Sequence, residues 1–470
     1  MGIYLDSPTA YTLYKNEASK TYFVDKTQIL EELFPLVGVG NNYICITRPR
    51  RFGKTMMANL IASFFSKACD ASGVFDKLSI SKSNAYYQYL NKYHVIHISL
   101  NELPKHCTTY EQYIDRIERR LVKDLKKVYT NVDIDENDAI WDIFTDIFTA
   151  EESVRFIFVL DEWDFIFHRD FVTENDKKSY INFLSNLLKD KPYVALAYMT
   201  GILPIEKYSS GSELNMFLEY TMATKEKYSG YFGFDDGEVD ELYRNYLAVT
   251  ENPNISREGL KIWYDGYNTA AGIRMYNPRS VVSALSDNQL GSYWTSSGPY
   301  DEIFYYIEKN IADVRDDLAR MVAGEAVAAK VQEYAATSMN LQTKDEIFSA
   351  MVVYVFLSYY DKKVSIPNKE LMDKFADMLL KEQSLGYVYR LAKESERMLK
   401  ATLEKDVDTM LAILEFAHDT EIPLLNYNNE TDLTAIVNLI YLAARDSYYM
   451  EREDKAGIGY VDARVIIGLS

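Results

Sequence analysis

Short apolar runs alternate with segments of helical periodicity over the first 235 residues of the chain. The runs are almost wholly apolar, as parallel strands covered on both faces of a sheet are. In the intervening segments, apolar residues recur at helical spacing. This alternation predicts an α/β fold in which crossover helices flank a parallel sheet. The predicted strands are residues 43–47, 94–100, 155–160 and 194–199, and the predicted helices include residues 55–65 and 110–129.

Charged helical patterns dominate the second half of the chain, where strands become rare. Helices are predicted at residues 238–247 and 256–264. The segment 265–297 is rich in turn residues and is typical of a compact connecting module. From residue 300 to 418 the period is almost entirely helical, with one interruption near residues 361–367. The sequence therefore predicts a mainly helical C-terminal region.

The length of 470 residues exceeds what one hydrophobic core supports, since such cores stop growing near roughly 250 to 300 residues. Two or three domains are expected. Hydrophobic residues at 48% and charged residues at 26% are ordinary for a soluble globular protein. No apolar run approaches the roughly 18 residues that span a bilayer, and the N-terminal segment resembles no export signal. We expect a cytoplasmic protein without a membrane partner.

The net charge of −19 and the three cysteines narrow the classes of partner and cofactor. A surface that coats nucleic acid needs clustered Lys and Arg, which this charge argues against, although local nucleic-acid contact stays open. Cys45, Cys69 and Cys107 are too few and too scattered for a disulfide framework or a zinc site. Buried thiols in a reducing compartment are the expectation.

The first candidate site follows the apolar strand at residues 43–47. A P-loop needs a buried strand that delivers a turn, backbone N–H groups that surround phosphates, and a helix whose N-terminus adds its positive end. In this interpretation Lys54 reaches the β- and γ-phosphates, the Thr55 hydroxyl holds Mg²⁺ and Gly53 lets the backbone come close. The predicted nucleotide-binding residues of this segment are Arg48, Pro49, Arg50, Arg51, Phe52, Gly53, Lys54, Thr55 and Met56.

The loop departs from the usual P-loop pattern GxxxxGK[ST] at its first position, where Arg48 replaces the glycine. It is also unusually cationic. Its arginines could add contacts to phosphate, or they could pair with the acidic body of the protein. A structural loop is the alternative to the nucleotide site, although the order strand, loop and helix favours the nucleotide.

A second candidate site lies about a hundred residues further on, where Asp161 and Glu162 end an apolar strand. In P-loop ATPases such an aspartate coordinates Mg²⁺ and the adjacent glutamate orients or deprotonates the attacking water. The alternative is a solvated strand end. We predict Glu162 and Lys54 as catalytic residues, and Thr55 and Asp161 as metal ligands.

Three further residues are weaker candidates. Thr200 closes the strand at residues 194–199, from which its side chain could sense the γ-phosphate, although a threonine at a strand end is commonplace. Arg274 and Arg279 flank a tyrosine-asparagine-proline turn and could bring a cation to the phosphates. Surface ion pairs in an acidic protein are the favoured alternative for these two arginines.

A series of short motifs covers most of the first 300 residues. They are YFVDKT (22–27), RPRRFGKT (48–55), DEWD (161–164), TGIL (200–203), LNMF (214–217), YFGF (231–234), WYDGY (263–267), YNP (276–278) and YWTSS (293–297). In combination they resemble the AAA-ATPase-like family of bacterial and archaeal proteins, whose members also carry a C-terminal PD-(D/E)xK nuclease-like domain. The resemblance implies a P-loop NTPase fold with ATP and Mg²⁺ as ligands, and it makes arginine at the first loop position normal.

The nuclease-like likeness is partial. Asp462 stands where such a site has its first acid, but the E-x-K that a metal site also needs does not follow before Ser470. We therefore expect an incomplete and inactive nuclease-like segment. The expected order is an AAA-ATPase-like P-loop domain at 1–235, a lid or connecting module at 236–300, a helical domain at 301–415 and the nuclease-like segment at 416–470.

The sequence thus predicts a Mg²⁺-dependent ATPase that couples hydrolysis to movement between the α/β core and the helical region. The alternative is a nucleotide-gated binding module with little hydrolysis, and a nuclease is the weakest reading. ATP versus GTP stays open. So does assembly into a homo-oligomer in which a neighbouring arginine completes the site.

Overall fold

The structure is a computed structural model that describes most of the chain. Residues outside the described ranges include 294–297, so that part of the YWTSS motif lies outside them. The described residues are 2–39, 42–151, 154–205, 212–222, 225–293, 311–331, 343–381, 383–419, 436–446, 448–456 and 459–467.

A five-stranded parallel sheet organises the N-terminal half, with strand order β2-β3-β4-β1-β5. All four predicted strands are confirmed to within two residues at either end. Each is almost entirely buried, which is why it appears in the sequence as an apolar run. The fifth, at one edge, was not predicted from the sequence. The strands are β1 (Tyr43–Thr47), β2 (His94–Ser99), β3 (Phe156–Asp161), β4 (Val194–Gly201) and β5 (Leu218–Tyr220).

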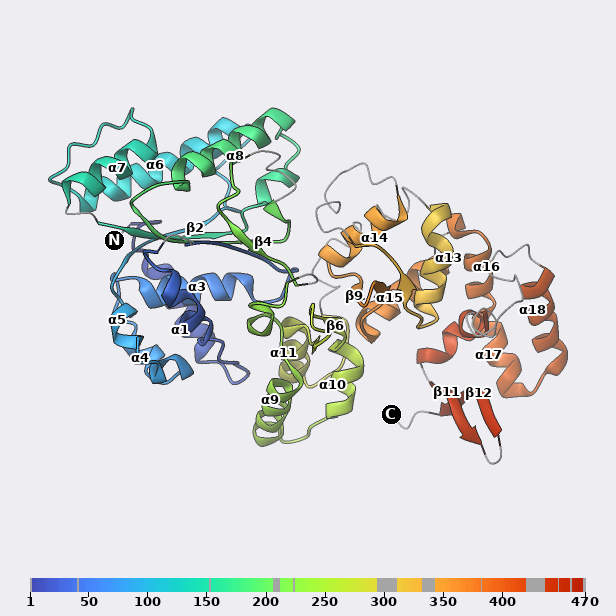
Figure 1. Cartoon of the computed structure of the whole chain (residues 1–470). Helices are drawn as coiled ribbons and strands as arrows, with labels where there is room; N and C mark the ends of the chain where they lie inside the picture. Colours follow the sequence, from blue (N-terminus) through green and yellow to red (C-terminus); the bar gives the residue numbers. More distant parts are fainter. Residues whose placement is uncertain are drawn as a thin grey trace.

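Helices cover both faces of the sheet, as the alternation of elements predicted (Figure 1). One face packs under α6, α7 and α8, whose apolar residues form one core with β2 and β3. The other face packs against α1 and α3 with the short helices beside them. The helices are α1 (Pro8–Ala18), α2 (Ile29–Leu33), α3 (Lys54–Phe65), α4 (Ser72–Phe75), α5 (Tyr86–Tyr89), α6 (Tyr110–Val128), α7 (Ile140–Ala150) and α8 (Glu174–Leu188).

A smaller module follows the sheet and has an apolar core of its own. It holds the two predicted helices, a third helix and a short antiparallel pair of strands. Its elements are α9 (Asp236–Val249), α10 (Arg257–Tyr264), β6 (Tyr267–Asn268), β7 (Arg274–Met275) and α11 (Pro278–Asp287). Residues 265–287 of the turn-rich segment therefore contain two short strands and a helix.

The C-terminal region is helix-rich but contains a small antiparallel sheet of order β8-β10-β9 that the helical period did not predict. The interruption expected near residues 361–367 is the turn and second strand of its hairpin. The elements are α13 (Ile311–Val322), β8 (Val327–Ala328), α14 (Lys344–Val353), β9 (Ser358–Tyr360), β10 (Lys363–Ser365), α15 (Lys369–Lys381), α16 (Tyr387–Lys393), α17 (Ser395–Glu404) and α18 (Val407–Asp419).

The last described elements form an antiparallel hairpin of β11 (Tyr448–Ala456) and β12 (Gly459–Ile467). Asp462 falls on β12, and the nuclease-like interpretation of this segment stays a prediction. Within the described ranges, no helix combines the length and the hydropathy that crossing a membrane requires.

Candidate nucleotide site at the P-loop

The predicted P-loop connects β1 to α3. Gly53 is the N-cap of α3 and adopts a left-handed backbone, with φ +87, which glycine tolerates and L residues rarely do. Having no side chain, it leaves the N–H groups of the first turn directed outward. The buried ammonium of Lys54 donates a 2.8 Å hydrogen bond to the Pro49 carbonyl, which closes the loop on itself. Thr55 follows on the exposed side of the helix.

Arg48 lies behind the loop instead of facing the phosphate side. Its guanidinium is 1% exposed and donates to the carbonyl oxygens of Thr47, at 2.8 Å, and Tyr220, at 2.9 Å. Its carbon Cζ is also 4.9 Å from the centre of the Phe232 ring. These contacts fasten the end of β5 to β1. The arginine therefore occupies the first loop position for a structural reason that a glycine could not satisfy.

Asp161 ends β3 next to the start of α3. Burial raises the pKa of Asp161 to about 6, and a hydrogen bond with the Thr55 side chain opposes this shift. Among the residues that the structure describes, none donates a hydrogen bond to its buried Oδ1. A buried carboxylate oxygen left open beside a hydroxyl suits a hard cation such as Mg²⁺. The structure thus brings together the two residues predicted as metal ligands.

Glu162 follows Asp161 directly but has a left-handed backbone conformation, with φ +54. Its Oε2 accepts a 2.8 Å hydrogen bond from Nδ2 of Asn101. The parallel register pairs Ser99 with Asp161, so the loop after β2 necessarily lies beside Glu162. Sequence reasoning missed Asn101. A polar residue just beyond the neighbouring strand was the signal that could have found it.

The next carboxylate of the DEWD motif, Asp164, is buried and positions the end of β4. It accepts hydrogen bonds from the backbone N–H groups of Ile202, at 3.2 Å, and Leu203, at 2.9 Å. A Cβ on Gly201 would lie 2.4 Å from Asp164 Oδ1, so only glycine fits there. Trp163 adds a 3.1 Å hydrogen bond to the Leu203 carbonyl. Hydrogen bonds therefore join the DEWD and TGIL motifs to each other.

Thr200 lies on β4 between β1 and β3, fully buried. Its hydroxyl donates a 2.9 Å hydrogen bond to the Ile46 carbonyl. In this state the hydroxyl joins β4 to β1, and the predicted contact with nucleotide stays a prediction.

Burial lowers the pKa of Lys54 to about 8, while Asp164, Asp161 and Glu162 oppose the shift. Most Lys54 ammonium groups are therefore charged near neutral pH. The pKa of Arg51 is lowered by burial and by the nearby cations of Arg279 and Arg50. A guanidinium nevertheless stays charged at any physiological pH. The loop side thus concentrates positive charge in a chain whose net charge is −19.

A cavity of about 1070 Å³ opens in front of the loop, comparable with small-molecule sites of roughly 300 to 1,000 Å³. Its floor is the P-loop from Arg50 onward with the start of α3, and Glu162 lies at its edge. The YFVDKT motif supplies another wall. Opposite, the wall comes from the connecting module and from the C-terminal region. The lining includes Tyr22, Phe23, Val24, Lys26, Arg50, Arg51, Phe52, Gly53, Lys54, Thr55, Met56, Glu162, Phe234, Arg279, Tyr354 and Phe356.

The two arginines of the connecting module have different surroundings. Arg274 is 57% exposed and pairs with the buried Asp265, its Nε lying 3.0 Å from the carboxylate. Arg279, at the start of α11, lines the cavity. The ion-pair alternative therefore fits Arg274, whereas Arg279 lies where a cation could meet phosphate.

Comparison with known proteins agrees with this geometry. Residues 13–210 match the family model described as "Predicted AAA-ATPase". This part of the chain is thus similar to predicted AAA-ATPases. The matched residues include the P-loop, the DEWD carboxylates and Thr200.

A curated relative from Azotobacter chroococcum, an uncharacterized protein in the vnfD 5' region, is 23% identical over 287 residues. This covers 60% of the chain, and the chain spans about half (52%) of the length of that relative. Among solved structures, the chain resembles the Walker-type ATPase PABY2304 of Pyrococcus abyssi, with TM-score 0.41 and 11% identity over 74% of this chain and 94% of that one. It also resembles the ORC2 protein of Aeropyrum pernix in ADPNP-ADP complexes, with TM-score 0.35 and 10% identity over 76% and 93% of the two chains.

The segment that matches the family model, residues 13–210, does not form the cavity alone. Tyr354 and Phe356 belong to the turn between α14 and β9, more than a hundred residues beyond the matched segment. Sequence reasoning did not connect these residues with the site. No signal in the sequence announces them, because their place depends on how the C-terminal region packs.

Proposed function

We propose that this protein binds ATP with Mg²⁺ at the P-loop cavity and hydrolyses it, and that hydrolysis drives movement between the sheet and the C-terminal region. The observation that carries the proposal is the approach of the buried Asp161 carboxylate to Thr55 and Lys54, two residues that line the cavity. Two motifs a hundred residues apart would not converge so by chance.

In this proposal the N–H groups of the first turn of α3 and the Lys54 ammonium bind the phosphates. Mg²⁺, held by the Thr55 hydroxyl and the Asp161 carboxylate, would supply neutralisation of phosphate charge. The Glu162 carboxylate orients water and accepts its proton once Asn101 releases it. Arg279 adds a cation from the connecting module.

The decisive experiment compares ATP turnover with ATP binding in wild type and in Glu162→Gln. We expect binding within about threefold of wild type and turnover lower by at least roughly 100-fold, since general-base catalysis contributes about 10² to 10⁴. Full turnover in this variant would remove the role assigned to Glu162. The same assay with GTP decides which base is preferred. Running it across protein concentrations tests the proposed homo-oligomer, because assembly would make turnover per subunit rise with concentration.

One observation favours a second candidate, a nucleotide-gated binding module with little hydrolysis. The Asn101 amide engages Glu162 in this state. The Asn101→Ala variant distinguishes the ATPase from the binding module. If the amide only restrains Glu162 during a catalytic cycle, turnover rises or stays the same. Absent turnover in wild type and in Asn101→Ala alike, with tight ATP binding, would favour the binding module.

A further inference from the structure

Phe52 is the one residue of the GxxxxGK[ST]-like loop whose described side chain joins the apolar core of the C-terminal region. The ring is 1% exposed and belongs to the same packed cluster as residues of α13, α14 and α15. It meets Tyr267 of β6 edge to face, with ring centres 5.2 Å apart and planes at 89°. Phe52 and its neighbours in the loop, Arg51 and Gly53, all line the nucleotide cavity. Phe52 thus anchors the P-loop, whose other residues would bind phosphate, in the apolar core of the C-terminal region.

The space around the Phe52 ring is closely filled. Gly233 of the YFGF motif approaches it with φ +84. A Cβ at that position would lie 3.2 Å from Met275 Cβ and 3.4 Å from Phe52 Cδ1. Since packed interiors have discrete arrangements and little slack, a shift of this ring requires its neighbours to shift as well.

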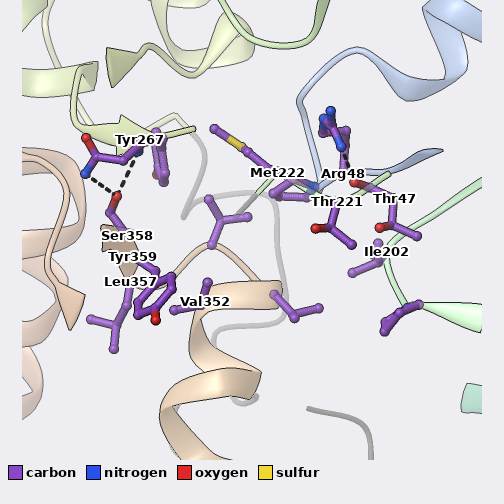
Figure 2. A pocket seen from close by; sticks show the side chains of 15 residues that line it. Thr47, Arg48, Ile202, Thr221, Met222, Tyr267, Val352, Leu357, Ser358 and Tyr359 are labelled. Carbon is purple, nitrogen blue, oxygen red and sulfur yellow. Dashed lines mark hydrogen bonds between the residues drawn. The ribbon is translucent and has the colours of Figure 1, made fainter. Parts of the chain in front are cut away.

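From Tyr267 the contact continues into the C-terminal region. The backbone N–H and the side-chain amide of Asn268 both donate 2.9 Å hydrogen bonds to the Ser358 hydroxyl of β9. At Gly266, with φ +118, a Cβ would lie 2.0 Å from the carbonyl oxygen of Pro367. Figure 2 shows Tyr267 and Ser358 across a small cavity from Thr47 and Arg48, and all four residues line that cavity. The WYDGY motif is therefore the joint between loop and C-terminal region.

The turn after α14 belongs to the same C-terminal region and contributes residues to the lining of the nucleotide cavity. Val355 has φ +69, which is a true outlier for a β-branched residue and costs conformational energy. Tyr354 and Phe356 on either side of it line the nucleotide cavity, whereas Val355 lines the small cavity that Thr47, Arg48 and Ser358 share. All three are at most 6% exposed. Strain of this kind persists where surrounding structure determines it, and it is concentrated at ligand sites and switches.

We propose that Tyr354 and Phe356 form part of the nucleotide site and that Phe52 is the positioning residue that ties the P-loop to them. Nucleotide binding and docking of the C-terminal region then favour each other, because a coupling free energy between two sites is reciprocal. This inference rests on the proposed function, whose nucleotide it assumes, and names the route by which that site is regulated.

The test is amide hydrogen exchange of the full chain with and without Mg²⁺ and a slowly hydrolysed ATP analogue. In wild type, the analogue slows exchange in residues 344–360. In Phe52→Ala this slowing is lost, and in Phe52→Leu, which keeps an apolar anchor, most of it returns. Phe375→Ala is the matched control, because Phe375 is an equally buried ring of the same cluster that lines neither cavity. It speeds exchange generally but keeps the slowing by the analogue.

Affinity provides a second measurement should Phe52→Ala fold poorly. Phe356→Ala weakens analogue binding by about tenfold, the effect of losing roughly one well-packed aromatic contact. Unchanged affinity in Phe356→Ala overturns the inference. So does tight binding by wild type with no slowing at residues 344–360, or equal loss of slowing in Phe375→Ala and Phe52→Ala, and the proposed function survives each of these results. Absent binding by wild type overturns both proposals together.

Discussion

The two ends of the P-loop, at Arg48 and at residues 53–55, have different surroundings. At the first end, Arg48 is buried and bonds to the carbonyl oxygens of β1 and β5. At the second end, Gly53, Lys54 and Thr55 face the cavity around a helix N-terminus that no cap side chain covers. The comparison teaches that the first position of this loop holds two strands together, whereas in the proposed function the last three residues are the ones that meet phosphate.

The largest expected effect is that of Lys54→Ala at the second end. Charge-assisted hydrogen bonds contribute about 1.5 to 3 kcal/mol each, so we expect ATP affinity to fall by roughly 100-fold. Titration calorimetry or fluorescent-nucleotide binding measures it. Lys20→Ala is the control, because Lys20 also lines the cavity but is exposed and paired with Glu17. Equal losses in the two variants would show that Lys54 has no special place in the site.

The next largest effect belongs to the first end and is one of stability. Arg48→Met keeps an apolar stem but leaves two carbonyl oxygens without their donor, which costs about 2 kcal/mol of the free energy of unfolding. Denaturant unfolding measures this cost, and ATP affinity of the folded variant stays within about threefold, since the side chain does not face phosphate. A loss of affinity as large as that of Lys54→Ala, in a variant that remains folded, would break the comparison.

The sheet could be predicted from the sequence because β1 to β4 are buried on both faces and read as apolar runs. The edge strand β5 has three residues, one of them Glu219, and offers no such run. The position of the loop between β1 and α3 and of Asp161 at the end of β3 was likewise predictable, because both follow apolar strands. That these residues bind phosphate and Mg²⁺ stays a prediction.

What could not be predicted depends on packing between distant segments. The inward turn of Arg48 needs the Tyr220 carbonyl, 172 residues away in the chain. The place of Asn101 beside Glu162 follows from strand register. The cavity wall formed by Tyr354 and Phe356 depends on the docking of the C-terminal region, whose short strands β8 to β10 lie within a sequence of mainly helical period.

The difference between Arg279 and Arg274 sharpens the comparison further, because both were candidates to assist the second end. Arg279→Ala removes a cation that lines the cavity, and we expect ATP affinity to fall about tenfold. Arg274→Ala removes an exposed partner of Asp265 and changes affinity by less than about twofold. Competition binding distinguishes them. The reverse order would assign the assisting cation to Arg274.

The smallest expected effect is the pH dependence of Mg²⁺-ATP binding, which separates the two charged groups of the second end. Deprotonation of Lys54, with a pKa of about 8, removes a phosphate donor, so affinity falls by about fourfold as pH rises from 7 to about 8.5. Protonation of Asp161, with a pKa of about 6, removes a cation ligand, so affinity falls by a similar factor as pH drops from 7 to about 5.5.

Two variants test which group causes the fall in affinity above pH 7 and which causes the fall below pH 7. Lys54→Arg keeps its charge across the alkaline range, so the fall above pH 7 disappears. Asp161→Asn cannot ionise, so whatever fall remains below pH 7 belongs to the phosphates of the nucleotide itself. A wild-type profile that is flat on the alkaline side, with an unchanged profile in Lys54→Arg, would mean that the ammonium does not meet phosphate, and the division of labour between the two ends would have to be redrawn.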